Sequence, residues 1–355
     1  MNTTRIAVNL VLCGKTRRKA ILAIAALLFG TISWDPASAA DNWEDVVTAA
    51  NTEGQVLLYS TKADADNAKL LDAFMKKFPH IQAKAVRLVG GAMVVKVDQE
   101  LQAGALAADV ILHAEHQWAI PKAKEGRLIL PTGPAVTLWK GAEKFYQDGR
   151  VQVTAEPWVI GYNTKVVKDP PTDWDSLLGS REYSGRIGLN EVSGLTVAIW
   201  YDFIDKRIPD YFHQLAQLKP QIYPNSAPLT AGLSSGEIAW APYSLASSIE
   251  PLKAKGAPVD YVIPKKGTWA IERSAMIFKE APHPNAARVL LDFMMSQEGQ
   301  QVLNTDRAGY TVAPGVKLTG ALDVDLKQIT STDYTSYDSS FTKTWQNRVD
   351  RLFRH

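Results

Sequence analysis

Short apolar runs that end in polar turns dominate the first third of the chain. Each run is followed by a segment whose apolar positions have helical spacing. The predicted strands of this part are residues 55–59, 83–89 and 108–112, and the predicted helices are residues 93–101 and a segment that ends at Phe78. This alternation predicts parallel strands buried between helices, an α/β fold in which ligands gather at the carboxyl ends of the strands.

A second alternating unit begins near Trp158. Its predicted strands are residues 159–162, 185–189, 237–243 and 259–263, and its predicted helices are residues 174–178 and a segment through Trp200 and Phe203. A further predicted strand, residues 269–278, and a predicted helix, residues 286–295, follow it. Gly236 predicts the stop of another helix. The polar residues 330–340 predict a surface loop.

Residues 1–39 predict a cleavable signal peptide. Lys15 and the basic run 17–19 precede the apolar run 20–32, and Ala37-Ser38-Ala39 matches the small-residue pattern of a cleavage site. The apolar run is shorter than the ~20 residues that a spanning helix needs, which disfavours an uncleaved anchor. We therefore expect a mature protein that starts near residue 40 in the periplasm, with the export route, Sec or Tat, left open.

Charge and cysteine content narrow the function classes. The full chain of 355 residues has 39 basic and 37 acidic residues, and loss of the leader leaves 34 and 36. With no basic excess we expect no nucleic-acid partner. The single cysteine, Cys13, leaves with the leader, which excludes a disulfide or a thiolate metal site in the mature chain. The length of the mature chain exceeds the ~250–300 residues that one core supports, so two lobes are expected.

Several motifs occur together in a specific order. They are Tyr59-Ser60-Thr61, Ala108-Asp109-Val110 and the segments 160–164, 174–178, 281–287 and 296–301. In this order and spacing the chain resembles the periplasmic solute-binding proteins of ABC importers, in the branch that contains ferric-ion, sugar-phosphate and phosphonate binders. The resemblance covers roughly residues 53–315.

The resemblance implies a two-lobed α/β fold of the type II periplasmic-binding-protein class, in which each lobe is a mixed sheet flanked by helices. The two hinge crossings are expected at residues 156–158 and 269–274. The predicted division is residues 1–39 for the signal peptide, 40–156 for the first lobe, 157–269 for the second lobe, and 270–355 for the return to the first lobe and the C-terminal helices. The implied function is capture of a small solute between the lobes and delivery to a membrane permease, by a monomer without cofactor or enzymatic activity.

The predicted ligand is a small organic anion: a carboxylate, phosphate or phosphonate. Backbone N–H groups at helix starts bind anions, and nearby hydroxyls extend such sites. The candidate turns are Tyr59-Ser60-Thr61, Ser193-Gly194 and Tyr243-Ser244. For each hydroxyl, capping of its own helix is the competing interpretation.

Four further side chains are candidates for the same ligand. Arg87 could bind an anion through two hydrogen bonds, or form a surface salt bridge. His113 is expected to form a hydrogen bond with an organic ligand or a polar contact at the rim. Trp158 and Trp269 fall at the predicted crossings, where each ring could stack on a ligand or pack the hinge.

A ferric-ion receptor is the first alternative, with His113, Glu115 and Tyr243 as donors. The resemblance implies two adjacent tyrosines on the second lobe for iron, whereas Tyr243 is followed here by Ser244. The sequence therefore favours an organic ligand and no metal.

An exported serine hydrolase is the alternative of another class, because residues 232–236 match the G-x-S-x-G pattern around Ser234. That nucleophile elbow requires a strand before the serine and a helix after it, whereas the sequence predicts the reverse order. No P-loop, no H-E-x-x-H motif and no complete dinucleotide fingerprint occurs. Delivery to a sensor kinase instead of a permease is a third alternative, which the sequence leaves open.

Overall fold

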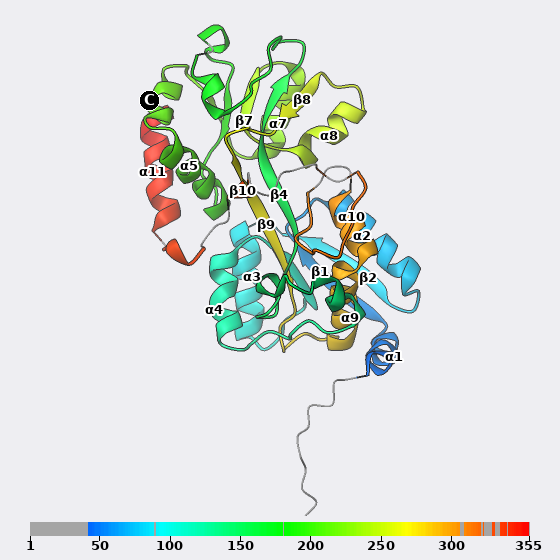
Figure 1. Ribbon diagram of the computed structural model, residues 1–355. Helices are drawn as coiled ribbons and strands as arrows, with labels where there is room; N and C mark the ends of the chain where they lie inside the picture. The colour runs from blue at the N-terminus through cyan, green and yellow to red at the C-terminus, as the bar shows by residue number, and fades with distance from the viewer. Residues whose placement is uncertain are drawn as a thin grey trace, which may run out of the picture. The chain divides into compact units, whose positions relative to one another are not determined.

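Three parallel strands predicted from the first apolar runs form one side of the main sheet in the computed structural model (Figure 1). The structure describes residues 42–88, 90–179, 181–305, 309–320, 322, 329–330, 334–338 and 340–354. The predicted signal peptide therefore lies outside the described residues. Strand β1 (Gln55–Ser60) pairs with β2 (Gln82–Arg87) on one side and with β3 (Val110–His113) on the other.

Two long strands extend this sheet and connect its two ends. β9 (Thr268–Met276) pairs antiparallel with β3 and with the first half of β4 (Arg150–Asn163). From Trp158 onward, β4 pairs instead with β7 (Trp240–Leu245) and β8 (Val259–Val262). Figure 1 shows β4 and β9 side by side as they pass from the group of α3, α4 and α9 to the group of α5, α7 and α8. These two passages are the hinge crossings.

The remaining strands are short. β5 (Gly188–Asn190) and β6 (Gln221–Tyr223) form a parallel pair, and Ile187 bridges to Trp240 at the start of β7. β10 (Ile329–Thr330) pairs with the start of β9. β6 was not predicted from the sequence, because its three residues are all half-buried and give no apolar run.

Helices cover both groups of strands. Those of the first part of the chain are α1 (Trp43–Glu53), α2 (Asp64–Lys77), α3 (Gly90–Gln102) and α4 (His116–Lys124). Those of the second are α5 (Leu195–Arg207), α6 (Tyr211–Ala216), α7 (Ser226–Ser235) and α8 (Ala246–Ala254). The last three are α9 (Pro284–Met295), α10 (Gln297–Asn304) and α11 (Phe341–Phe353). Among the described residues, each helix is too short or too polar to span a lipid bilayer.

Short 3₁₀ helices complete the regular structure. They are η1 (Pro134–Trp139), η2 (Glu143–Phe145), η3 (Trp174–Leu177), η4 (Arg181–Tyr183) and η6 (Tyr334–Ser336). Tyr334 corrects one prediction, because it lies inside the polar stretch 330–340 that was expected to be a surface loop. Its side chain is 6% exposed and its ring stacks on His116, 4.2 Å away. The residues around Tyr334 are rich in hydroxyl groups and form no apolar pattern, so the sequence did not indicate a buried aromatic residue here.

Buried apolar side chains form separate groups on the two sides of the crossings. One group joins β1, β3 and the first half of β4 with α2 and α9, and the largest joins the second half of β4 with α5, α7 and β7. Helix α11 packs against α5 and α6 and contributes Trp345 and Val349 to the largest group. The predicted two-lobed α/β fold with two hinge crossings is confirmed, whereas the division at residues 156 and 269 remains a prediction.

Some motif residues hold this fold together. The buried carboxylate of Asp109 accepts hydrogen bonds of 2.7 Å from the backbone N–H groups of Leu57 and His283. Ser296 caps α10, where a Cβ on Gly299 would lie 1.8 Å from the carbonyl oxygen of Phe293. Only glycine permits this close approach of α10 to α9. Asp109, Ser296 and Gly299 therefore stabilise the packing of the fold, and they lie outside the ligand region described below.

Candidate functional site

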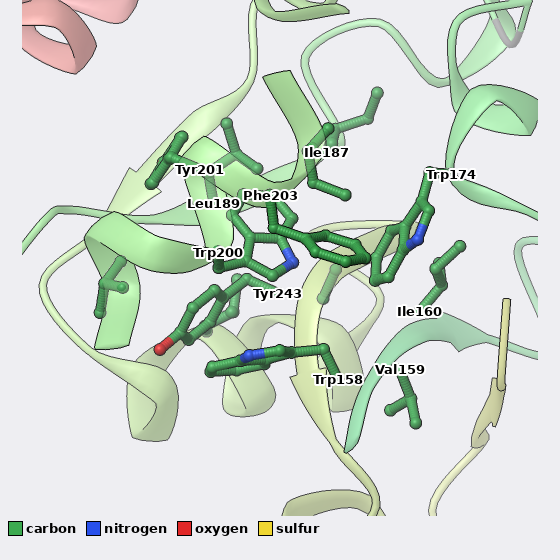
Figure 2. Packing of buried hydrophobic residues seen from close by; sticks show 14 of the residues in the cluster. Trp158, Val159, Ile160, Trp174, Ile187, Leu189, Trp200, Tyr201, Phe203 and Tyr243 are labelled. Atoms are coloured by element: carbon green, nitrogen blue, oxygen red, sulfur yellow. The ribbon is translucent and has the colours of Figure 1, made fainter. Parts of the chain in front are cut away.

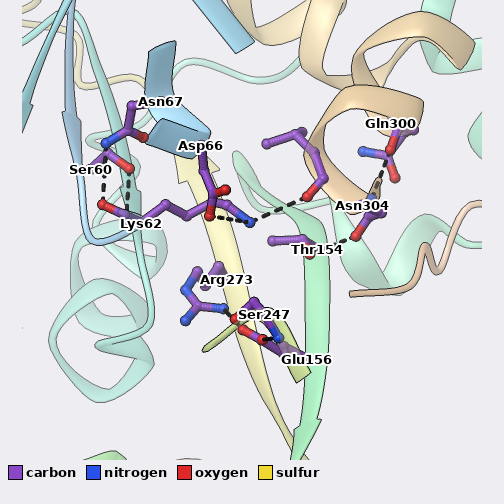
Figure 3. A network of polar contacts seen from close by, with 11 residues as sticks. Ser60, Lys62, Asp66, Asn67, Thr154, Glu156, Ser247, Arg273, Gln300 and Asn304 are labelled. Atoms are coloured by element: carbon purple, nitrogen blue, oxygen red, sulfur yellow. Dashed lines mark hydrogen bonds and ion pairs between the residues drawn. The ribbon is translucent and has the colours of Figure 1, made fainter. Parts of the chain in front are cut away.

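Polar and charged side chains gather on one face of the crossing strands, beside the end of β1 (Figure 3). Ser60 ends β1 and is fully buried, and its hydroxyl accepts a hydrogen bond from the N–H of Lys62 at 3.1 Å. Thr61 donates its N–H to the carbonyl of Leu112 on β3. The turn after β1 is thereby fixed so that the side chain of Lys62 enters the protein.

Lys62 is a buried cation. It is 5% exposed, and its ammonium group donates to the carbonyl of Leu303 at 3.2 Å and lies 3.7 Å from the carboxylate of Asp66. Burial lowers the pKa of Lys62, and the nearby charge of Arg273 lowers it further. A buried ammonium group is costly unless an anion is close, so this position favours a negatively charged partner.

Arg273 and Glu156 form an ion pair between the two crossing strands. The guanidinium Nη1 of Arg273 lies 3.2 Å from Oε2 of Glu156. Oε1 of Glu156 accepts a hydrogen bond of 3.2 Å from the N–H of Ser247, in the first turn of α8. The carboxylate of Glu156 is 2% exposed. It therefore occupies the position at the helix N-terminus where an anion is stabilised by free N–H groups.

The guanidinium group has unused donors. Arg273 Nε is buried and has no hydrogen-bond partner among the described residues. Tyr243 of β7 also lies near this charge: burial raises the pKa of its hydroxyl, and Arg273 offsets part of that rise. Lys62, Arg273 and the N-terminus of α8 thus lie along the crossing strands, and the charge of Arg273 also acts on Tyr243 of β7.

Aromatic side chains, among them Trp158 and Tyr243, pack together in the largest buried apolar group (Figure 2). The rings of Trp158 and Tyr243 are 3.9 Å apart, and Trp269 stacks on Trp158 at 6.2 Å with an angle of 22°. Both tryptophans are 1% exposed. The indole N–H of Trp158 has no partner among the described residues. In this conformation the rings pack the hinge, which is one of the two roles predicted for them.

Other predicted residues face elsewhere. The hydroxyl of Tyr59 donates to Glu100 of α3 at 3.0 Å, on the face of β1 opposite to Ser60. Arg87 ends the edge strand β2 and is exposed. Ser193 is exposed, and Gly194 precedes α5 with room around it. The hydroxyl of Ser244 donates to the carbonyl of Ala241. Their roles as ligand contacts remain predictions.

His113 is fully buried on the Tyr59 face of the sheet. Its Nδ1 accepts the N–H of Glu115, and its ring lies 5.6 Å from that of Trp118. Burial holds the pKa of His113 well below its usual range. Tyr243 packs with Trp158 in a different group of side chains, and the described residues contain no cluster of three or more His, Cys, Asp or Glu suited to a metal ion. Among the described residues, His113 and Glu115 contact each other, whereas Tyr243 contacts neither of them.

Ser234 lies in the last turn of α7, and strand β7 follows the helix. Gly236 ends the helix in the left-handed conformation, with φ of 82°, as predicted. The order is helix, turn, strand, which is the reverse of a nucleophile elbow.

Lys62, Glu156 and Arg273 were not among the residues predicted for the site. A signal was present for each: Lys62 directly follows Ser60-Thr61, and the other two fall inside the segments 156–158 and 269–274 predicted to cross between lobes. A charged residue inside an otherwise buried crossing strand needs a partner, so it is a candidate for function.

Comparison with known proteins identifies the group to which this architecture corresponds. The family model described as bacterial extracellular solute-binding protein matches residues 69–328. The substrate-binding protein of an ABC transporter from Agrobacterium tumefaciens is 18% identical with a TM-score of 0.74, covering 84% of this chain and 94% of that one. Among curated proteins, none matches the chain in sequence.

Two further solved structures have named ligands. Iron-bound HitA from Pseudomonas aeruginosa is 22% identical with a TM-score of 0.67, covering 83% of this chain and 99% of that one. AfuA from Actinobacillus pleuropneumoniae with fructose-6-phosphate is 18% identical with a TM-score of 0.68, covering 85% and 99%. At these identities the likeness shows the fold and leaves the ligand of this chain open.

Proposed function

Because the chain belongs to the family of bacterial extracellular solute-binding proteins, we propose that it captures a small anionic organic solute in the periplasm. The family implies a small-molecule ligand and an ABC permease as partner. The proposal adds the charge of the ligand, its position at Lys62 and Arg273, export by the leader 1–39, and action as a monomer.

One observation carries the anionic ligand: Lys62 and Arg273 are two largely buried cations that influence each other electrostatically. Of their nearby carboxylates, Asp66 lies 3.7 Å from the ammonium group of Lys62, and Glu156 also accepts a hydrogen bond from the N–H of Ser247. An anionic ligand would add negative charge between the two cations and fill the free Nε of Arg273. Arg–carboxylate and Arg–phosphate contacts with two hydrogen bonds are among the strongest polar interactions in proteins.

The same arrangement supplies a mechanism for closure. Lys62 follows a strand of the first lobe, whereas Ser247 and Tyr243 belong to the second, and Arg273 lies on the strand between them. A ligand that contacts groups from both lobes binds the closed conformation more tightly than the open one. It shifts the equilibrium toward closure by that difference in affinity. A permease that recognises the closed form would then distinguish loaded from empty receptor.

The carboxylate of Glu156 competes with a ligand anion for the same hydrogen-bond donors. It bonds to both Arg273 and the N–H of Ser247. A ligand anion must share these donors with Glu156 or displace it. The affinity for an anion is therefore set by a balance between ligand and carboxylate, and a weak or monovalent anion is at a disadvantage.

A thermal-shift screen followed by calorimetry tests this proposal. The panel contains organic carboxylates, sugar phosphates, phosphonates and ferric salts, because a ligand bound only by the folded protein raises its melting temperature. We expect an organic anion to give the largest shift, and Arg273→Gln to abolish it. Arg181→Gln, an exposed arginine in η4, is the matched control.

Two outcomes would overturn the proposal. A shift produced by ferric salts, together with an absorption band of tyrosinate bound to iron, would support the ferric receptor. A cationic or neutral ligand unaffected by Arg273→Gln would place the site elsewhere.

A further inference from the structure

The face of the crossing strands opposite to Arg273 carries its own polar side chains. Gln152 of β4 pairs in register with Ser274 of β9, which in turn pairs with His113 of β3. Residues paired in register point to the same face of a sheet, so these three form a polar row across three strands. They are 7%, 3% and 0% exposed, respectively. The neighbouring Ile111 and Met276 on this face are apolar and buried.

The hydrogen-bonding capacity of this row is largely unused. His113 Nε2 has no partner within the described part of the chain. The amide of Gln152 and the hydroxyl of Ser274 likewise make no side-chain hydrogen bond to any described residue. A buried polar atom without a partner costs free energy, which applies to His113 Nε2. Gln152 and Ser274 instead line a cavity, where a bound molecule or water can reach them.

A cavity of about 250 Å³ adjoins this row. Its polar lining comes from β4, β9, α4 and the segments that carry η2 and η6: His116, Lys144, Arg150, Gln152, Ser274 and Tyr334. His116 and Tyr334, which stack on each other, form one wall. The cavity is separate from Lys62, because Arg273 and Ser274 are adjacent in β9 and point to opposite faces.

The two carboxylates of the cavity already have partners. Asp148 accepts hydrogen bonds from the guanidinium of Arg150, including one of 3.0 Å from Nε. Glu272 bonds to the hydroxyl of Tyr334, and burial raises its pKa to about 7. By contrast, Lys144 is exposed, and its ammonium group lies over the ring of Phe145 without an ion-pair partner among the described residues. The cavity groups without a partner among the described residues are thus the ammonium group of Lys144, the amide of Gln152 and the hydroxyl of Ser274.

We infer that this cavity is a second binding site, which takes a small organic carboxylate bearing a hydroxyl group. The carboxylate would lie against Lys144 and Arg150, and the hydroxyl would bond to Gln152 and Ser274. The site is independent of the anion proposed between the lobes, since it uses none of the same side chains. Ordered water alone is the competing occupant, because a polar cavity of this size admits several water molecules.

Titration calorimetry with lactate tests the inference, with lactamide as the uncharged control. The titration is performed on the mature chain carrying Arg273→Gln, which removes the guanidinium group of the first site. We expect lactate to bind with one equivalent and lactamide not to bind. Lys144→Gln and Gln152→Leu should each weaken lactate roughly tenfold, because each removes a hydrogen bond to a charged or polar group. Lys140→Gln, an exposed neighbour outside the cavity, should leave it unchanged.

Lys144 is exposed, so its substitution tests the site even if Gln152→Leu impairs folding. Lactate that binds the unsubstituted chain but not the Arg273→Gln chain would be bound between the lobes, and this would overturn the inference. Absence of lactate binding from both chains, or binding that is indifferent to Lys144→Gln and Gln152→Leu, would leave water as the occupant and also overturn it.

Discussion

The two faces of the crossing strands β4 and β9 differ in how their polar groups are satisfied. On one face, Arg273 and Glu156 pair with each other across the crossing strands, and Glu156 also accepts a hydrogen bond from the N–H of Ser247 of α8 in the second lobe. On the opposite face, Gln152 and Ser274 have no side-chain hydrogen bond to any described residue, and the cavity beside them is lined by the two crossing strands, α4 and the segments of η2 and η6, without any residue of α5, α7 or α8. On the basis of this difference we propose that only the first face couples binding to lobe closure.

Removal of the guanidinium group is the strongest test of that difference. Arg273→Gln should weaken the solute between the lobes about 100-fold or more, because truncating one member of a buried charge pair costs several kcal/mol. Arg273→Lys should fall between it and the unsubstituted protein, since lysine keeps the charge but loses the fork of donors. Calorimetry measures both variants. If Arg273→Gln lowered the affinity for the solute and the affinity for lactate equally, the two faces would not be independent.

Glu272 should affect stability and leave solute affinity unchanged. Burial raises its pKa from 4.5 to about 7, so the folded protein keeps this proton between these pH values while the unfolded chain loses it. Stability therefore falls as pH rises through this window, by about 2 kcal/mol. Glu272→Gln should flatten the fall in a series of urea unfolding curves. If the stability of Glu272→Gln fell with pH as steeply as that of the unsubstituted protein, Glu272 would not be the group responsible.

Lys62 should separate affinity from stability. Because burial lowers its pKa, the charged form destabilises the folded state, and the free energy of unfolding rises with pH as folded Lys62 loses its proton below the usual value of 10.5. Lys62→Met should weaken an anionic solute roughly tenfold without lowering the free energy of unfolding. Lys255→Gln, an exposed lysine that ends α8, is the control. Undiminished affinity in Lys62→Met would remove Lys62 from the site.

Glu156 should act in the opposite direction. Glu156→Gln keeps an oxygen for the N–H of Ser247 but removes the negative charge that competes with the solute. We expect affinity to increase about threefold to fivefold, an effect within the range of one charge-assisted hydrogen bond. Weaker binding would mean that Glu156 positions Arg273 instead of competing for it.

The turn before α5 should give the smallest effect. Ser193 is exposed, and the residues before it bond to the C-terminal segment: Val192 accepts from Gln346 of α11, and Glu191 from Arg354, which follows α11. Ser193→Ala should change solute affinity less than twofold, and Arg87→Ala should behave likewise, with an unchanged dependence on salt. A large loss in either variant would restore the predicted role of that residue.

The fold was predictable because its signal is local. Continuous apolar runs mark β1, β3 and the second half of β4, and their alternation with helices indicates an α/β fold from neighbouring residues alone. The part of the site that the first lobe contributes was partly predictable for the same reason, since Ser60 directly follows an apolar run. Tyr334 was missed because a single aromatic residue in a polar stretch gives no periodicity.

The charged part of the site depends on contacts between distant segments. Lys62 bonds to Leu303, 241 positions further along the chain, and Glu156 and Arg273 are 117 positions apart. No pattern in a short window reports such pairs. From the sequence, Arg87 was a candidate for a ligand contact or for a surface salt bridge because it ends a predicted strand. That strand is at the sheet edge, where an arginine remains in solvent.

A crystal structure with the solute that emerges from the thermal-shift screen tests the central claim most directly. We expect the anionic group of the solute within about 3 Å of the guanidinium of Arg273 and beside Lys62, with the two lobes closed around it. A solute bound away from Arg273, or one whose anionic group contacts a single lobe, would contradict the account.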